Sequence, residues 1–505
     1  MAEERAIAVD LAELTNEDGD PISILAWGDP VTVVEEDEKR SKVEILDFET
    51  KPDGSILPTT RTGFIRRHPR DKKSVEVSLP ADQVKVLKLD FVDVQQGDGA
   101  LLETPAGKTI TLDGGDNQLF ARYLASRFPG TGPDNRKAID AMLVSHGDAD
   151  HFAGLAEIRD SETNENPRKR LFAEPLRVFH NGLVKRPSKV DDVDSFGATE
   201  EVGGKTIITG LETDVTKVPD DQLNQHFERW KKALLGWEED GAEIEFRRLA
   251  KGDDDAFDFL AGEGIEVEVL GPILTHEGGV TGLRFLGEPP KGPQFGAATP
   301  DAEFGSISPS HTINGHSILL RLGFKNWRLL FAGDLNTQSE QQLVADAEAG
   351  KVDLQGEVFK VPHHGSAEYS TAFLQAVKPL VSVVSSGDEN ARKEYIHPRA
   401  TLMNALGRCS RNDAAVVFVT ELVAFFETVG WVRPDEKAGV DSKPPKPEEK
   451  DFFAFRRTAY GQVRVRTDGE RLFVYTNSGQ KDLKEGYAFT ADAPGEANPV
   501  EVVKA

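Results

Sequence analysis

The stretch SHGDADH contains, in a span of six residues, four side chains of types that bind metal ions: His146, Asp148, Asp150 and His151. Imidazole nitrogens together with carboxylate oxygens suit zinc, manganese or iron at neutral pH. Aspartate and glycine are also ordinary turn and helix-capping residues, but a turn does not require two histidines flanking two aspartates. The pattern therefore predicts that residues 145–151 form a metal-binding loop, called the metal loop below.

The flanking sequence indicates how this loop is held. The apolar run AIDAMLV at residues 138–144 is typical of a buried strand, and FAGL at residues 152–155 of the start of a helix. The four ligand candidates therefore lie on the tight connection between a strand end and a helix.

Two later strand ends carry further candidates. The apolar run WRLLFAG leads directly to Asp334, and VFKV leads through Pro362 to His363 and His364. Adjacent histidines at a strand end point to different sides, so one of the two is expected to bind metal while the other binds substrate or orients a ligand. Lys360 within VFKV is expected near a substrate anion.

A third candidate group follows the run PLVSVV. His397 precedes Pro398, and proline is favoured in the first turn of a helix, so His397 is expected at a helix N-terminus as a general acid, a ligand or a ligand-orienting residue. His180 follows a short strand, and a lone histidine there is more often a hydrogen-bonded structural residue.

His-x-Asp-x-Asp-His after a buried strand resembles motif II of the metallo-β-lactamase superfamily, which is usually His-x-His-x-Asp-His. Asp148 stands where the second histidine usually lies. This variant is similar to the branch that contains the soluble domain of ComEC-type DNA-uptake proteins. Residues 87–115 resemble the opening of that domain, with Gln95 in place of its usual glycine.

The resemblance implies roles for residues outside the metal loop. Asp98 is expected near the loop, and Asp113 is expected to support it rather than to bind metal directly. For the third motif, His311 and His316 resemble the hydrolase form of the superfamily, while Asn314 and Ser317 resemble the ComEC-type form. His316 is the preferred candidate.

The fold that the resemblance implies is α/β: an αββα metallo-β-lactamase sandwich with metals at the strand ends. Two divalent ions, zinc or manganese, would activate a water for hydrolysis. Asp150, Asp334, His397 and Lys360 are the catalytic candidates. The implied metal ligands are His146, Asp148 and His316 for one ion, Asp150, His151 and either His363 or His364 for the other, with Asp334 bridging the two.

A phosphodiesterase or nuclease acting on nucleic acid or another phosphodiester is the leading functional hypothesis. Hydrolysis of an ester, lactone or thioester is the alternative, and a non-catalytic, metal-stabilised binding module is the third. Replacement of the usual histidine by Asp148 makes the site richer in oxygen, which favours manganese or a weakly held zinc.

Composition sets the remaining expectations. The 505 residues carry a formal net charge of −26 and one cysteine, which disfavours a broad basic surface for nucleic acid and excludes an internal disulfide framework. No apolar run is long enough for a membrane span and the N-terminus lacks a secretory signal, so a cytoplasmic enzyme without a membrane partner is expected.

The chain divides into four expected parts. Residues 1–82 resemble an all-β SH3-like domain that binds a protein or peptide partner, and residues 83–430 form the catalytic domain with an insertion at about 160–305. Residues 431–450 are rich in proline, lysine and glutamate and are expected to form a linker or loop. Residues 451–505 are expected to add a β-hairpin to the sandwich, followed by a tail.

Overall fold

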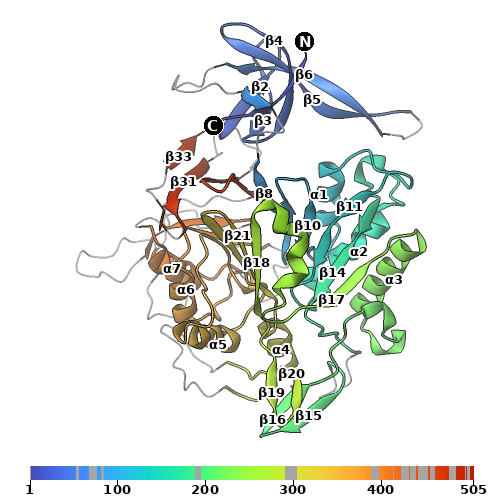
Figure 1. Cartoon of the computed structure of the whole chain (residues 1–505), viewed down its shortest axis with the longest axis vertical. Helices are drawn as coiled ribbons and strands as arrows, with labels where there is room; N and C mark the ends of the chain where they lie inside the picture. The colour runs from blue at the N-terminus through green and yellow to red at the C-terminus, as the bar shows by residue number, and fades with distance from the viewer. Residues whose placement is uncertain are drawn as a thin grey trace, which may run out of the picture.

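Figure 1 shows the computed structural model, in which an all-β N-terminal unit lies at one end of a larger α/β body. The structure describes residues 2–52, 56–67, 77–80, 85–187, 195–289, 304–387, 397–412, 415–421, 431–432, 440–441, 453–454, 461–476, 485–494, 496–497 and 501–504.

The N-terminal unit is a seven-stranded antiparallel sheet in the order β3-β2-β6-β5-β4-β1-β7. Its buried residues, among them Ile7, Leu14 and Val43, form a core of their own. The strands predicted at the start of the chain are confirmed, whereas the SH3-like resemblance stays a prediction. The strands are β1 (Glu3–Ile7), β2 (Leu11–Thr15), β3 (Pro21–Ala26), β4 (Pro30–Glu36), β5 (Arg40–Thr50), β6 (Ile56–Arg66) and β7 (Val77–Pro80).

The α/β body is built on two mixed sheets. The first has the order β17-β14-β12-β10-β9-β8-β29-β30-β31-β32, and β33 also pairs with β31. Its strands are β8 (Leu87–Phe91), β9 (Gly99–Glu103), β10 (Thr109–Asp113), β12 (Ala141–Leu143), β14 (Arg177–His180), β17 (Glu245–Arg248), β29 (Val463–Thr467), β30 (Arg471–Thr476), β31 (Glu485–Ala493), β32 (Glu496–Ala497) and β33 (Glu501–Lys504).

The second sheet has the order β18-β21-β22-β23-β24-β25. β24 reads VSVV and is buried throughout, as expected for a strand with both faces covered. The strands of this sheet are β18 (Ile265–Gly271), β21 (Leu319–Phe324), β22 (Trp327–Phe331), β23 (Val358–Lys360), β24 (Val381–Val384) and β25 (Val416–Val419).

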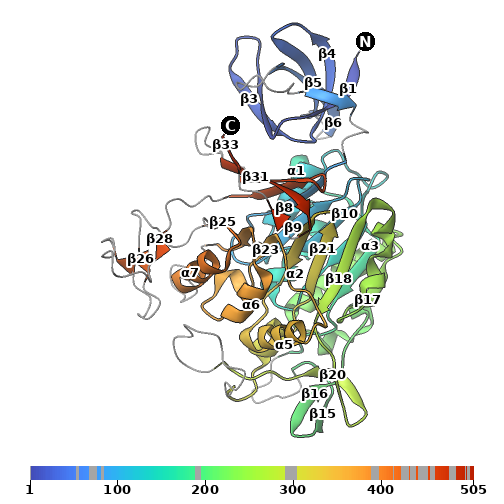
Figure 2. The ribbon, with the colours of Figure 1, turned by 60° about the vertical axis from the view of Figure 1, so that its left-hand side comes forward.

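Helices cover the outer face of each sheet, and the two sheets bury their main core between them. This arrangement confirms the predicted αββα sandwich, whose layers are visible in Figure 2. The first sheet carries α1 (Leu119–Arg127), α2 (Ala149–Ser161) and α3 (Gln225–Glu239), and the second carries α5 (Thr337–Glu348), α6 (Thr371–Val377) and α7 (Ala400–Cys409).

The range expected as one insertion, about 160–305, needs correction. It supplies β14 and β17 to the first sheet, because β14 pairs with β12 and β17 pairs with β14, and it supplies β18 to the second sheet, because β18 pairs with β21. A separate four-stranded sheet is the part that lies outside the sandwich, followed by α4 (Pro309–Gly315). Its strands are β15 (Thr199–Val202), β16 (Lys205–Ile208), β19 (Thr275–Glu277) and β20 (Val280–Arg284).

The C-terminal hairpin extends the first sheet, because β29 pairs antiparallel with β8. Most of the expected linker, residues 431–450, lies outside the described residues, apart from β26 (Trp431–Val432) and β27 (Val440–Asp441), which pair with each other. The N-terminal unit rests on the hairpin: Arg471 Nη2 donates to Asp10 Oδ2 at 2.6 Å, and Ala26 packs with Phe473 and Tyr475.

A buried charge network ties the hairpin to β8. Arg466 Nη1 donates to Asp90 Oδ1 at 2.8 Å, and the Tyr123 hydroxyl donates to Asp90 Oδ2 at 2.6 Å. Burial raises the pKa of Asp90, but Arg466 and Arg464 outweigh it and hold that pKa well below its usual range. None of the helices in the described parts of the chain is long and apolar enough to cross a membrane.

Replacing Asp90 by alanine is expected to destabilise the chain by about 3–5 kcal/mol, because the buried guanidinium of Arg466 loses its counter-charge. The free energy of urea unfolding measures this. Asp47→Ala is the control, because Asp47 pairs with Arg61 on the exposed surface of β5 and β6 and its loss should not be measurable. Equal urea midpoints for both variants would contradict the role of the Asp90 network.

Candidate metal centre

The metal loop lies where the sequence predicts it: it follows β12 and continues into the first turn of α2. Asp148 occupies the N-cap position of α2 but makes no capping hydrogen bond, and its carboxylate instead forms an ion pair with Lys185. Asp150 lies in the first turn of α2 with its Oδ2 3.3 Å from His364 Nε2. Neither aspartate is therefore explained by capping.

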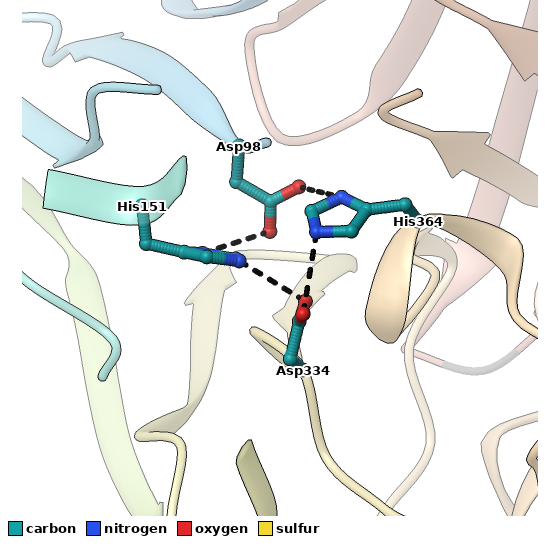
Figure 3. Close-up of side chains that lie close together, drawn as sticks. All are labelled: Asp98, His151, Asp334 and His364. Atoms are coloured by element: carbon teal, nitrogen blue, oxygen red, sulfur yellow. Dashed lines mark ion pairs between the residues drawn. The ribbon is translucent and has the colours of Figure 1, made fainter. Parts of the chain in front are cut away.

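Four buried side chains converge at the centre of Figure 3: Asp98, His151, Asp334 and His364. His151 Nε2 lies 3.2 Å from Asp334 Oδ1, and His364 Nε2 lies 3.2 Å from Asp334 Oδ2. Asp98 faces both imidazoles, at 3.6 Å from His151 Nδ1 and 3.4 Å from His364 Nδ1. These ligand atoms all lie within 4.8 Å of one another, so one compact site can hold a cation.

Strand ends from both sheets supply the cluster. Asp98 precedes β9, His151 follows β12, Asp334 follows β22 and His364 follows β23. β22 and β23 are parallel neighbours, so their carboxyl ends meet at one edge of the second sheet. The general rule that open α/β sheets place ligands beyond the carboxyl ends of strands holds here for three of the four residues.

Hydrogen bonds fix the orientation of both clustered imidazoles. His151 Nδ1 donates to Asp113 Oδ2 at 2.8 Å, and His364 Nδ1 donates to the Ser385 carbonyl at 3.1 Å. In the neutral form of each ring, Nε2 therefore carries a lone pair that faces Asp334. A lone pair facing a carboxylate is repulsive unless a proton or a cation lies between them.

Several buried nitrogen and oxygen atoms of the centre have no hydrogen-bond partner, as expected for atoms that bind a cation. Within the described part of the chain, His146 Nε2, His151 Nε2, His364 Nε2, Asp98 Oδ1 and Asp334 Oδ1 are buried without a hydrogen-bond partner. The ring of His146 lies 4.1 Å from that of His151, and its Nε2 lies 4.0 Å from Asp148 Oδ2. His146, Asp148 and Asp150 therefore border the four-residue cluster and can extend it.

The charges of the cluster depend on one another. Burial raises the pKa of Asp334, but His364 and His151 outweigh it and hold that pKa well below its usual range. Burial lowers the pKa of His151, yet Asp334, Asp98 and Asp113 together raise it well above the usual value. Protons on the imidazoles thus offset the buried carboxylates when no metal ion does.

Asp113 supports the metal loop, as expected. Its carboxylate accepts the Ser145 backbone N–H at 2.7 Å and the Ser145 hydroxyl at 2.6 Å, besides the bond from His151. Ser145 also lies 3.1 Å from His146 Nδ1. One buried carboxylate therefore positions both histidines of the metal loop.

Lys360 is buried beneath the cluster rather than placed at its opening. It pairs with Asp98 and donates to the Gly333 carbonyl at 2.9 Å, and its side chain is 4% exposed. The expectation that Lys360 contacts a substrate anion is therefore corrected: it neutralises Asp98. Lys185, which the sequence analysis did not single out, stands at the rim with a side chain that is 32% exposed.

His316 does not join the cluster, contrary to the preferred assignment. Its Nε2 donates to the Arg284 carbonyl at 2.8 Å, and burial lowers the pKa of this imidazole to about 4. Ser317 takes the place instead: its Oγ lies 3.2 Å from His146 Nδ1 and accepts the Asp334 backbone N–H at 2.9 Å. The Asn-x-x-Ser form of the third motif fits the structure, and His311 pairs with Glu368 at 3.6 Å.

Of the two adjacent histidines, His364 is the one that joins the candidate metal cluster. The ring of His363 is 6.2 Å from that of His364 and 6.0 Å from that of His397. Burial, with His364 and His363 nearby, lowers the pKa of His397 to about 3, so at neutral pH it is an uncharged imidazole rather than an imidazolium acid. His180 uses both ring nitrogens, with Thr213 and Gly182, as a structural residue.

The family described as Metallo-beta-lactamase superfamily matches residues 92–387, more than half of the chain. Over 94 residues the chain is 40% identical to the competence protein ComA of Neisseria gonorrhoeae, which corresponds to 18% of this chain and 12% of that protein. This partial match agrees with the predicted ComEC-like branch.

A solved structure is also similar. The crystal structure of Tm1679, a metal-dependent hydrolase of the β-lactamase superfamily, aligns with 66% of this chain and 95% of its own, with 11% identity and a TM-score of 0.29.

Gly97→Ala is expected to abolish metal binding, because a Cβ at this position would lie 1.9 Å from the Asp150 carbonyl and Gly97 has a φ of +111°. Metal content by elemental analysis measures the effect. Gly107→Ala is the matched control, because Gly107 has a φ of +87° but nothing within 4 Å of an added Cβ. Full metal occupancy in Gly97→Ala would show that this contact does not shape the loop.

Asp113→Asn is expected to weaken metal binding by roughly 10- to 100-fold while the chain stays folded, because the amide no longer accepts both the Ser145 and His151 protons. Competition with a chelator of known affinity measures it, and circular dichroism checks the fold. An unchanged affinity would show that His151 keeps its orientation without this partner.

Proposed function

Because the chain belongs to the metallo-β-lactamase superfamily of metal-dependent hydrolases, we propose that it is a phosphodiesterase, with nucleic acid as the favoured substrate class. The observation that carries this proposal is the oxygen-rich character of the centre. The cluster pairs Asp98 and Asp334 with two imidazoles, and the bordering residues add two more carboxylates but only one more imidazole: Asp148, Asp150 and His146. Carboxylate-rich sites suit harder ions such as manganese and the phosphate oxygens that such ions bind.

The partial match to a competence protein gives a second line of support. It covers 12% of that protein, so the activity of the whole relative is not carried over, and nucleic acid remains a proposal for this chain. The three-residue spacing of Asn314 and Ser317 points to the same branch of the superfamily.

A divalent cation held by the cluster would supply a water of lowered pKa and stabilise negative charge on the attacked phosphorus. We propose two such ions, the second bordered by His146 and Asp148. Asp150 is suited to orient the attacking water and accept its proton, because its side chain is 27% exposed whereas those of Asp98 and Asp334 are 8% and 4% exposed. The open side of the cluster is therefore the side of Asp150.

Lys185 is the residue we propose to hold the substrate phosphate. Its ammonium lies on the same open side, in an ion pair with Asp148. Uncharged His397 is suited to accept a proton or orient His363. The Lys185 contact would hold the substrate phosphate beside Asp148.

Asp150→Asn is expected to reduce cleavage of bis(p-nitrophenyl) phosphate and short single-stranded DNA by about 100-fold or more, because the water loses its proton acceptor. Activity with added Mn²⁺ or Zn²⁺, metal content and circular dichroism are measured together. Asp258→Asn is the control, because Asp258 is exposed on the short helical segment Asp254–Glu263.

The same assays separate the alternatives. Cleavage of p-nitrophenyl esters or thioesters with phosphodiesters spared would contradict the proposal and favour the ester, lactone or thioester hydrolase. Higher activity with Mn²⁺ than with Zn²⁺ is the expected order, because the centre is rich in oxygen ligands.

A further inference from the structure

A hollow separate from the metal centre lies between the four-stranded sheet, α4 and α5. Its volume is about 260 Å³. In Figure 1 these elements occupy the lower part of the body, with β19 and β20 below α4 and α5. The walls combine apolar side chains, including Ile273, Leu286 and Leu343, with polar ones.

Arg284 is the unusual wall residue. It ends β20, is half-buried, and burial is the sole cause that lowers its pKa. Among the described residues its guanidinium has neither an ion pair nor a hydrogen-bond partner, although its backbone carbonyl accepts the bond from His316. An arginine held partly out of water without a counter-charge is costly, so a ligand that supplies the charge would bind favourably.

The rest of the wall matches an anion. No carboxylate lines the hollow in the described part of the chain, whereas Lys205, Ser339 and Gln342 do. The Lys205 Nζ forms an ion pair with Glu277 Oε2 at 2.7 Å, so Arg284 is the main positive charge of the wall without a counter-charge. His316 is neutral at pH 7, so Arg284 supplies the positive charge without help from this ring.

The hollow and the metal centre are separated by a single layer of backbone. His316 and Leu335 line the hollow, while the next residue along the chain, Ser317, and the preceding one, Asp334, face the centre. A molecule in the hollow therefore does not touch the clustered ligands, and the two sites are distinct.

We propose that this hollow is a binding site for a small phosphorylated molecule with an apolar or aromatic body, anchored by Arg284. The planar guanidinium presents paired N–H donors that match phosphoryl oxygens. The volume exceeds what inorganic phosphate needs, and the apolar wall gives the remainder of the ligand a surface to bury. The site does not depend on the phosphodiesterase activity proposed above.

Isothermal titration of the metal-loaded full chain with phenylphosphonate tests the site, because this probe carries both parts and has no ester bond to hydrolyse. Arg284→Gln is expected to lower the affinity of one binding event by roughly 10- to 100-fold, the loss of a charge-assisted contact worth about 1.5–3 kcal/mol. Inorganic phosphate is expected to bind more weakly than phenylphosphonate.

Arg248→Gln is the matched control, because Arg248 is another half-buried arginine at the end of a strand but does not line the hollow. It should bind phenylphosphonate as the unmodified chain does. Thermal denaturation of both variants shows whether each is folded, and a ligand-induced rise in melting temperature gives a second measure of binding.

Identical isotherms for the unmodified chain and Arg284→Gln would overturn the proposal, as would equal losses in Arg284→Gln and Arg248→Gln. Absence of binding to the unmodified chain at millimolar probe would overturn it as well. Benzoate binding with phenylphosphonate excluded would overturn the phosphoryl assignment.

Discussion

The orientation of two imidazoles toward one carboxylate is the constraint on which the centre depends. His151 and His364 each donate a hydrogen bond from Nδ1 to a partner outside the cluster, and the Nε2 of each ring lies 3.2 Å from Asp334. This arrangement is repulsive without positive charge between the groups. By orienting the two rings, Asp113 and Ser385 thus create a site that requires either a proton or a metal cation.

The strand order of the two sheets brings these partners together. Asp113 ends β10, the metal loop follows its parallel neighbour β12, and Asp334 and His364 follow the parallel pair β22 and β23. Each residue alone is a polar group at a strand end. The packing of the two sheets places both strand edges around one buried site, with Asp98 contributed by the turn before β9.

The sequence predicted the parts of the site that local pattern determines. The metal loop, Asp334 and the His363–His364 pair follow recognisable strands, whereas the choice within the pair was open. Both histidines have a positive φ, 50° and 51°, so they lie in a turn and the alternation of strand side chains does not apply. Gln95, in place of the family's glycine, likewise adopts a φ of 66°. His316 was the wrong third ligand because the last turn of α4 directs Ser317, not His316, toward His146.

The buried carboxylates of the centre are balanced by positive charge from the imidazoles and Lys360. Asp98, Asp113, Asp150 and Asp334 are carboxylates gathered around the buried imidazoles, and Lys360 is a fixed cation that neutralises Asp98 from below. Burying uncompensated carboxylates is costly, so protons on His151 and His364 carry the balance in the metal-free chain. A divalent ion held by the cluster would supply the same balance with two positive charges, and the ammonium of Lys360 already offsets one of the carboxylates.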